Sequence, residues 1–128
     1  MVASASDFSL DACSSYSLRR LERLPISHLM FSHIVIFWTK PDVSSASEKL
    51  IAGAEEFLRP IPGVLQFHIG KMITSPREVV DQSYQVALNL IFPDKQAQDD
   101  YQVHPLHLEF VEKVFKPVCA RAVIYDFE

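Results

Sequence analysis

The sequence predicts an α+β domain of order βαββαβ, in which two helices pack on one face of a four-stranded antiparallel sheet. Residues 31–38 and 83–92 are rich in β-branched and aromatic residues, which favour strands. Residues 50–58 instead carry apolar side chains at helical spacing. The chain has 128 residues, and 48% of them are hydrophobic, so it is long and apolar enough for one core.

Prolines bound the first half of the predicted fold. A strand over residues 31–38 ends at Lys40-Pro41-Asp42, which is a turn sequence. Serines between positions 44 and 47 are candidate N-caps for the first helix, and Pro60 ends its apolar pattern. A second strand is expected over residues 64–72.

The second half is expected to contain a polar loop, two strands and a helix that is interrupted. Residues 74–82 are polar and predict the loop, and the third strand follows over residues 83–92. Asp94 is expected to cap the next helix. A further amphipathic helix runs from Pro105 to Phe115, and residues 120–127 form the last strand.

The N-terminal 29 residues differ from the rest of the chain. Residues 1–29 are rich in serine and show no sustained strand or helix period, so we expect a disordered N-terminal extension before a domain over residues 30–128. Arg19, Arg20 and Arg23 are balanced by acidic residues in the same segment, and no apolar signal region follows them. A targeting segment is therefore not predicted.

Charge and cysteine content exclude several classes of partner. The formal net charge is −4 and no run of lysine or arginine accompanies the aromatic residues, which argues against nucleic acid binding. No apolar run approaches the ~20 residues of a membrane helix, because Gln85 and Asn89 interrupt the longest candidate. Cys13 and Cys119 are too few for a disulfide framework, so a cytoplasmic protein is expected. No phosphate-binding glycine loop is present in the sequence, and no cofactor is predicted.

Apolar residues on both faces of the predicted sheet indicate a homodimer. Two helices cover only one face of a four-stranded sheet, which leaves the other face for a partner. We expect the uniformly apolar stripes to meet the helices and the mixed stripes to face a second copy around a partly polar cavity. The uniformly apolar stripes are Ile34, Ile36 and Trp38 on the first strand and Val86, Leu88 and Leu90 on the third, and the mixed stripes are Phe31, His33, Val35 and Phe37, with Gln85, Ala87 and Asn89.

Side chains able to move protons or hold a metal concentrate between Tyr101 and His107. In a continuous helix these two residues would point to faces about 120° apart. Pro105 lies between them, and a proline is tolerated in the first turn of a helix rather than in its interior, so a new helix is expected to begin there. His104 is then expected to be extended. Such a break directs Tyr101, His104 and His107 toward one space.

Three segments of the sequence resemble the stress-responsive A/B barrel (Dabb) family. They are Phe31-Ser-His-Ile-Val-Ile-Phe37, Ile61-Pro-Gly-Val64 and Asp100-Tyr-Gln-Val-His-Pro-Leu-His107. The resemblance runs from Met30 to Phe127. It implies a ferredoxin-like fold whose sheets pair into a dimeric α/β barrel, in agreement with the homodimer expected from the strand patterns.

The same resemblance implies a site. A plant polyketide cyclase of this family performs an aldol condensation with a tyrosine and a histidine at the positions matching Tyr101 and His107. By that resemblance His107 is the catalytic base and Tyr101 donates a hydrogen bond to the oxyanion. His33 matches a further pocket histidine, whereas Gln85 and Ala54 replace a pocket histidine and a pocket tyrosine. The expected substrate-binding residues around the catalytic pair are His33, Val35, Phe37, Gln85, Ala87 and His104.

The residues leave three interpretations of this region open. Tyr101, His104 and His107 brace the helix break, or Tyr101 and His107 serve a small-molecule site, or His104 and His107 bind a metal with His33. The metal interpretation is disfavoured because Pro105 disturbs the spacing of the histidines and no carboxylate or thiolate accompanies them within the Tyr101–His107 motif. A hard cation held by backbone carbonyls leaves no sequence signature. We therefore predict a homodimer with a small-molecule cavity and unassigned reaction, and a cofactor-independent cyclase or lyase acting on a carbonyl compound as the alternative.

Overall fold

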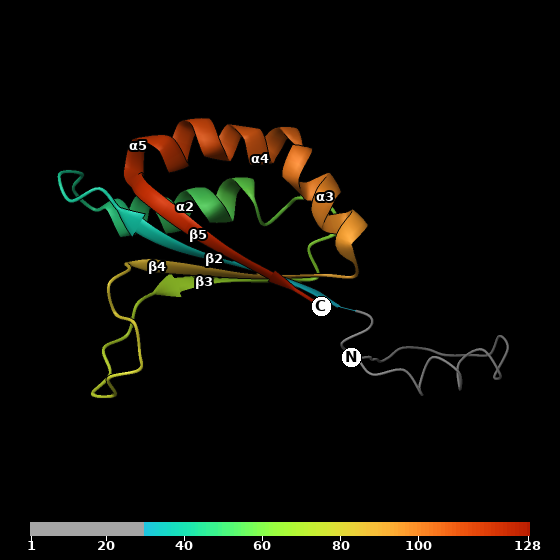
Figure 1. Ribbon diagram of the computed structural model, residues 1–128. Helices are drawn as coiled ribbons and strands as arrows, with labels where there is room; N and C mark the ends of the chain where they lie inside the picture. The colour runs from blue at the N-terminus through green and yellow to red at the C-terminus, as the bar shows by residue number, and fades with distance from the viewer. Residues whose placement is uncertain (1–29) are drawn as a thin grey trace, which may run out of the picture.

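The structure, a computed structural model, describes residues 30–128, in which helices cover one face of a four-stranded antiparallel sheet (Figure 1). The extension expected over residues 1–29 lies outside the described residues. The strands are β2 (Phe31–Thr39), β3 (Gln66–Lys71), β4 (Val86–Phe92) and β5 (Cys119–Phe127). Their order across the sheet is β3-β4-β2-β5, so the first and last strands of the domain lie side by side.

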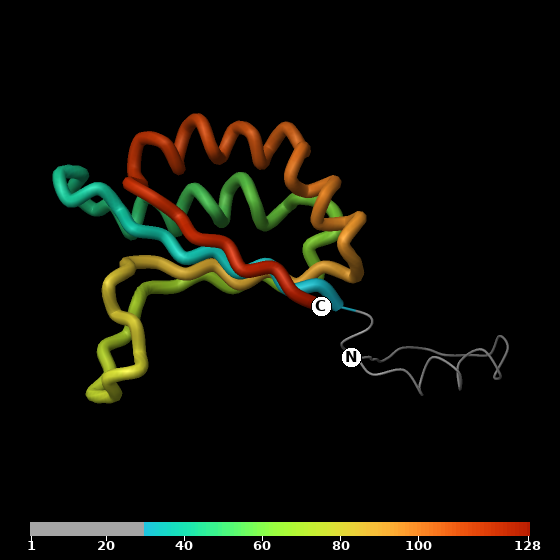
Figure 2. Tube along the Cα trace, viewed as in Figure 1, coloured from blue at the N-terminus to red at the C-terminus, as the bar shows by residue number. Residues whose placement is uncertain are grey.

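The helices are α2 (Ala46–Phe57), α3 (Lys95–Val103) and a longer helical segment that starts at Pro105. The longer segment begins as α4 (Pro105–Phe110), widens into the π-helical turn η2 (Val111–Phe115) and ends as α5 (Lys116–Val118). It runs beside α2 over the sheet, and α3 is set at an angle to it (Figure 2). The order of elements confirms the predicted βαββαβ arrangement. None of the helices in residues 30–128 has the length and apolar character needed to cross a membrane.

The two predicted helix caps differ in outcome. Asp94 caps α3 as expected, because its Oδ1 accepts a hydrogen bond from the N–H of Ala97 at 2.9 Å. Ser45 is the residue that precedes α2, but its side chain makes no capping hydrogen bond and its φ of 53° is left-handed. The expectation of a serine side-chain cap at this helix was therefore wrong, since the left-handed backbone turns the chain into the helix without one.

The widened turn η2 has a local cause in the sequence. Pro117 has no N–H to donate, and a proline ring crowds the carbonyl four residues earlier in a regular helix. Directly before it, the N–H of Lys116 bonds the carbonyl of Val111, five residues back. Val114 packs against α2 so closely that a Cβ built on Gly53 lies 2.6 Å from its methyl groups. A glycine at position 53 therefore permits the close approach of α2 and η2.

The face of β2 that meets the helices is opposite to the predicted one. His33 and Val35 lie across from Leu90 and Leu88 in the β2–β4 pair, so all four residues share the buried face under the helices. The prediction was correct for the stripe Val86, Leu88 and Leu90 and wrong for the stripe Ile34, Ile36 and Trp38, which lies half-buried on the open face. The covered face accepts a histidine because Asp126 pairs with it.

The open face of the sheet carries adjacent apolar side chains from its two neighbouring strands. Ile34 and Ile36 of β2 lie across from Tyr125 and Val123 of β5 on this face. Phe127 continues the row, and Tyr125 and Phe127 are 59% and 57% exposed. No helix covers this side of the sheet in the described part of the chain (Figure 1).

Candidate small-molecule site

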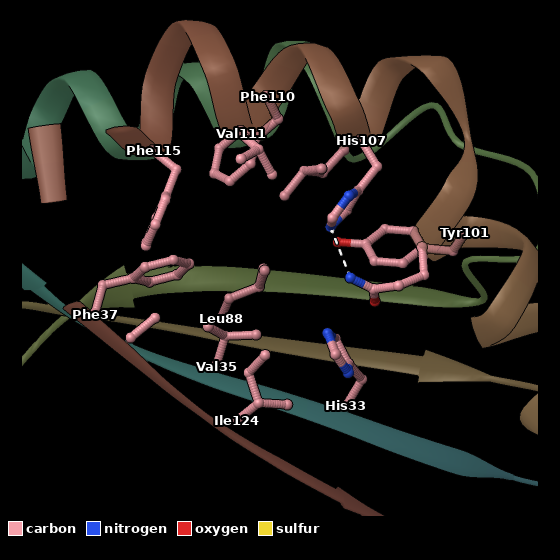
Figure 3. A pocket seen from close by; sticks show the side chains of 13 residues that line it. His33, Val35, Phe37, Leu88, Tyr101, His107, Phe110, Val111, Phe115 and Ile124 are labelled. Atoms are coloured by element: carbon pink, nitrogen blue, oxygen red, sulfur yellow. Dashed lines mark hydrogen bonds between the residues drawn. The ribbon is translucent and has the colours of Figure 1, made fainter. Parts of the chain in front are cut away.

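A pocket of about 180 Å³ lies between the helices and the covered face of the sheet. Its lining combines four polar residues, His33, Tyr101, Gln102 and His107, with nine apolar ones, Val35, Phe37, Leu58, Leu88, Phe110, Val111, Phe115, Ala122 and Ile124. The labelled polar side chains gather at one end and the rings of Phe37 and Phe115 at the other (Figure 3). This pocket lies inside one chain, whereas the cavity expected from the strand patterns lies between the sheets of two copies. His33, Val35 and Phe37 therefore line a pocket on the covered face of the sheet, and not on the face expected to meet a partner.

The helix break at Pro105 places two of the polar residues. His104 is extended, with φ of −65° and ψ of 141°, and Pro105 occupies the first turn of α4, as the sequence predicts. The Nδ1 atom of His104 accepts a hydrogen bond from the N–H of Leu106 at 3.1 Å. His104 therefore caps α4 and does not line the pocket.

Tyr101 and His107 meet at the polar end of the pocket. Their ring centroids are 4.9 Å apart with the planes inclined by 66°, and the hydroxyl of Tyr101 points toward the imidazole (Figure 3). Tyr101 is only 1% exposed, and this burial raises the pKa of its hydroxyl far above the ordinary value. Burial, and secondarily the charge of His33, lowers the pKa of His107. At neutral pH the tyrosine is thus a hydrogen-bond donor and the histidine a neutral proton acceptor.

His33 forms the floor of the same end of the pocket. It is 3% exposed, and its Nδ1 atom lies 2.5 Å from Oδ1 of Asp126, which is 39% exposed on β5. Its ring contacts that of Tyr101 at a centroid distance of 5.8 Å. Asp126 thereby supplies the hydrogen-bond partner that a buried imidazole needs.

The structure unites some of the expected site residues and separates others. His33, Val35, Phe37, Tyr101 and His107 all line the pocket. Gln85 and Ala87 do not line the pocket. Gln85 directly precedes β4 and Ala87 lies within it, and both are on the side of the sheet that faces away from the helices. The side chain of Gln85 instead accepts a hydrogen bond from the N–H of Thr39 at 2.9 Å.

Two polar residues at the site were missed by the sequence interpretation. Asp126 shares a strand face with Ile124, so alternation along β5 was the available signal. Gln102 follows Tyr101 directly and reaches the pocket from α3, where its Nε2 lies 3.5 Å from Nε2 of His107. Within residues 30–128, no cluster of three or more histidine, cysteine or acidic side chains is arranged to hold a metal ion.

A βαββαβ chain with helices on one face of an antiparallel sheet is a ferredoxin-like fold. Residues 31–128 match the family model of the Stress Responsive A/B Barrel Domain. The chain therefore belongs to this family, as its strand and Tyr101–His107 motifs predict. No curated protein matches the sequence.

Solved structures give the same fold. A Dabb family protein from Mesorhizobium loti, described as ferredoxin-like, is 27% identical, with a TM-score of 0.63 over 77% of this chain and 95% of that one. A dimeric ferredoxin-like protein of unknown function from Thermobifida fusca is 20% identical, with a TM-score of 0.63 over 77% and 89%. The hydroxynitrile lyase of Passiflora edulis is 20% identical, with a TM-score of 0.65 over 77% and 91%. At 20% identity the last two likenesses concern the fold alone.

Proposed function

We propose that the chain forms a homodimer in which each protomer binds a small, uncharged carbonyl compound and moves a proton on it. The observation that carries this proposal is the placement of Tyr101 and His107, one a donor and the other an acceptor, at the polar end of an otherwise apolar pocket. Such a combination of apolar walls with few convergent polar groups is typical of small-molecule sites.

The lining defines the class of ligand. None of the residues around the pocket, all within the described range, is lysine, arginine, aspartate or glutamate, so a carboxylate or phosphate ligand would find no counter-charge there. The apolar end, formed by Phe37 and Phe115, suits a hydrocarbon or an aromatic ring (Figure 3). At about 180 Å³ the pocket is slightly larger than an apolar cavity of about 150 Å³ that admits benzene. A single ring bearing a short carbonyl chain meets these conditions.

The proposed reaction step is proton transfer next to the carbonyl. His107 takes the proton from a carbon adjacent to the carbonyl group, and the electron pair of that C–H bond moves onto the carbonyl oxygen. Tyr101 donates a hydrogen bond to the resulting oxyanion. The enolate then attacks a second carbonyl carbon, and the new alkoxide takes the proton back from His107. The reverse sequence cleaves a carbon–carbon bond beside a hydroxyl group, so cyclase and lyase chemistry share this step and need no cofactor.

Exchange of carbonyl-adjacent protons with heavy water tests this proposal. Phenylacetone is a suitable probe because it combines one aromatic ring with a ketone and acidic C–H bonds, and NMR follows its deuteration. We expect the protein to accelerate exchange, and His107→Ala to reduce the acceleration by about 10²–10⁴-fold, which is typical of a catalytic base. Tyr101→Phe should also reduce it. Equal rates with wild-type protein and with His107→Ala would overturn the proposed chemistry.

A carrier that binds without reaction is the second candidate, and the depth of Tyr101 favours it. A tyrosine that is 1% exposed and packed on Phe92 at a centroid distance of 5.1 Å also stabilises the helix break. Retention of phenylacetone without accelerated exchange, measured on the same samples, distinguishes the carrier from the enzyme.

The homodimer is proposed from the open face of the sheet. Ile34, Ile36, Tyr125 and Phe127 form an apolar row there that no described helix covers. A second copy that packs the same face against it would bury this row and make an α/β barrel of the two sheets. Light scattering after size exclusion at micromolar concentration is expected to give twice the mass of the chain.

A pair of variants isolates the interface. Phe127→Arg places a charge on the open face and is expected to yield monomers. Leu108→Arg places the same charge at a residue of α4 that is similarly exposed, at 55%, and is expected to leave the dimer intact. Circular dichroism checks that both variants fold. A monomeric wild-type protein would contradict the proposed dimer.

We infer that the protein works in a reducing compartment such as the cytoplasm. Cys119 keeps a free thiol within the described residues, and burial raises its pKa to about 11, so it stays protonated and unreactive. Thiol titration of the purified protein under denaturing conditions tests this inference, with free cysteines expected and an oxidised Cys119 contradicting it.

A further inference from the structure

We propose that Gln102 is a positioning residue that holds His107 in the neutral tautomer with the proton on Nδ1, leaving Nε2 as the proton-accepting atom. The consequence for catalysis rests on the proposed function, but the tautomer does not. Neither residue identity nor spacing in the sequence points to this role, because it arises from side chains that meet across the helix break.

The first observation is the orientation of the Gln102 amide. Gln98, one turn earlier in α3, is 4% exposed, and its Nε2 donates a hydrogen bond to Oε1 of Gln102 at 2.8 Å. With its oxygen engaged, Gln102 presents its amide Nε2 to the imidazole Nε2 of His107, 3.5 Å away. An amide N–H donates, so the facing imidazole nitrogen must carry the lone pair.

The second observation is that, among residues 30–128, Gln102 makes the one hydrogen bond to the imidazole of His107. Nδ1 of His107 is buried and has no hydrogen-bond partner among the described residues. The contact to Gln102 is therefore the one hydrogen bond within the described structure that distinguishes the two ring nitrogens. In a site that burial has already made unfavourable for the imidazolium, one directed donor is enough to select between the neutral tautomers.

The charged and titratable groups that face His107 do not oppose this assignment. Tyr101 of α3 offers a hydroxyl that burial keeps protonated, because its pKa is raised. His33 of β2 lies on the other side of Tyr101 and is hydrogen-bonded to Asp126 of β5. The charge of His33 disfavours a proton on His107, which acts in the same direction as the Gln102 amide.

The length of the contact has a functional meaning. At 3.5 Å the hydrogen bond is at the long limit and therefore weak. It can orient the imidazole, and breaking it to admit a substrate costs little free energy. A substrate proton approaching Nε2 takes the place of the amide N–H. Gln98 keeps the Gln102 side chain near the pocket when this exchange occurs.

Ring ¹⁵N NMR of histidine-labelled protein tests the tautomer directly. In the wild-type protein, above the pKa of His107, we expect Nδ1 to be protonated and Nε2 bare. Gln102→Glu replaces the amide donor by a carboxylate, which accepts hydrogen bonds. In the neutral imidazole the ring proton should then move to Nε2, and the pKa of His107 should rise by about one unit or more. Gln102→Leu should give a mixture of tautomers. Gln96→Glu adds the same charge on the exposed side of α3 and is expected to change neither.

Two results would overturn the inference. One is a wild-type His107 with the proton on Nε2, which means that the Gln98–Gln102 amide pair is oriented the other way. The other is a tautomer that is unchanged in Gln102→Glu.

The exchange assay separates this inference from the proposed function. If the tautomer responds to position 102 while phenylacetone exchange is unaffected by His107→Ala, the proposed function fails and the inference stands. If exchange depends on His107 but the tautomer is insensitive to position 102, the inference fails alone. If the inference and the proposed function both hold, Gln102→Leu lowers turnover with little change in KM, because the catalytic base is disturbed and the binding surface is not.

Discussion

Tyr101 and His107 face one another across the break at Pro105, with ring centroids 4.9 Å apart. Without the break, six helical positions would separate their directions by about 120°. The extended conformation of His104 turns α4 away from the axis of α3, and both rings then reach the same pocket. The proposed acid–base pair is thus a product of backbone geometry, and it depends on the proline.

Pro105→Ala should weaken both the break and the site. Alanine permits His104 to become helical, so α3 and α4 compete to form one helix and the Tyr101–His107 contact is lost. The gain in freedom of the unfolded chain alone costs about 0.4–1 kcal/mol of stability. Denaturant unfolding and phenylacetone binding measure the two effects. Pro60→Ala, in the exposed turn after α2, is the control and should leave binding unchanged; wild-type binding by Pro105→Ala would show that the proline is dispensable.

The pH dependence of exchange should report His107. Its neutral form is the base, and its pKa is lowered from the ordinary value of 6.5, so the rate should rise with pH through a midpoint below 6.5 and then remain flat. The plateau should persist into alkaline solution because the raised pKa of Tyr101 keeps its proton in place. A midpoint above 6.5 in the free protein would contradict this assignment.

The same lowered pKa predicts a loss of stability in acid. The unfolded chain binds a proton at His107 with the ordinary pKa, while the folded chain resists it. The unfolded state therefore holds more protons in the window between the lowered pKa and 6.5, and the free energy of unfolding falls as pH decreases through that window. Comparison with His107→Gln by urea unfolding isolates this contribution, and parallel pH profiles of the two proteins would contradict it.

Asp126 should contribute to stability through His33. Asp126→Ala leaves a buried imidazole nitrogen without its partner, and we expect a loss of about 1 kcal/mol, at the lower end for such groups because Asp126 is partly exposed. Asp126→Asn keeps an acceptor at the same place and should lose less. Asp42→Ala, at an exposed turn, serves as the control in denaturant unfolding. Equal stabilities of Asp126→Ala and the control would mean that the hydrogen bond between His33 and Asp126 does not stabilise the protein.

The contact between Gly53 and Val114 should show as coupling in a double-mutant cycle. Gly53→Ala places a methyl group in a contact of 2.6 Å, so overpacking of about 1–3 kcal/mol opposes a gain of about 1 kcal/mol in helix propensity. Val114→Ala makes room, and the double variant should be more stable than the sum of the single changes predicts. Ala52→Gly at the exposed neighbouring position measures the propensity difference separately. If the changes in the free energy of unfolding for Gly53→Ala and Val114→Ala were additive, the two residues would not be coupled, which would mean that η2 shifts to accommodate the added methyl group at no energetic cost.

The sequence predicted the parts of this fold that depend on local chemistry. The strand over residues 31–38, the Asp94 cap and the helix start at Pro105 each follow from residue types within a few positions. The face of β2 that meets the helices was predicted wrongly because both faces are apolar. Which face of β2 is buried depends on a residue 93 positions away, because Asp126 provides the hydrogen-bond partner that allows His33 to be buried.

The candidate site was predictable only in part for the same reason. Tyr101, His107 and His33 stand out as reactive residue types. Gln102 does not, because a glutamine on a helix is usually solvated, and its role depends on the amide of Gln98 and on the angle between α3 and α4. Gln85 and Ala87 were expected at the site because the cavity was expected on the other side of the sheet.

NMR of the histidine rings during titration with phenylacetone shows directly whether the pocket binds a carbonyl compound, because the described histidines occupy different places. His33 and His107 line the pocket, His104 caps α4, and His68 of β3 lies exposed on the open face. We predict that the signals of His33 and His107 shift together and saturate, while those of His104 and His68 stay in place. Saturable shifts at His68 without shifts at His107, or no shifts at all, would contradict binding in this pocket.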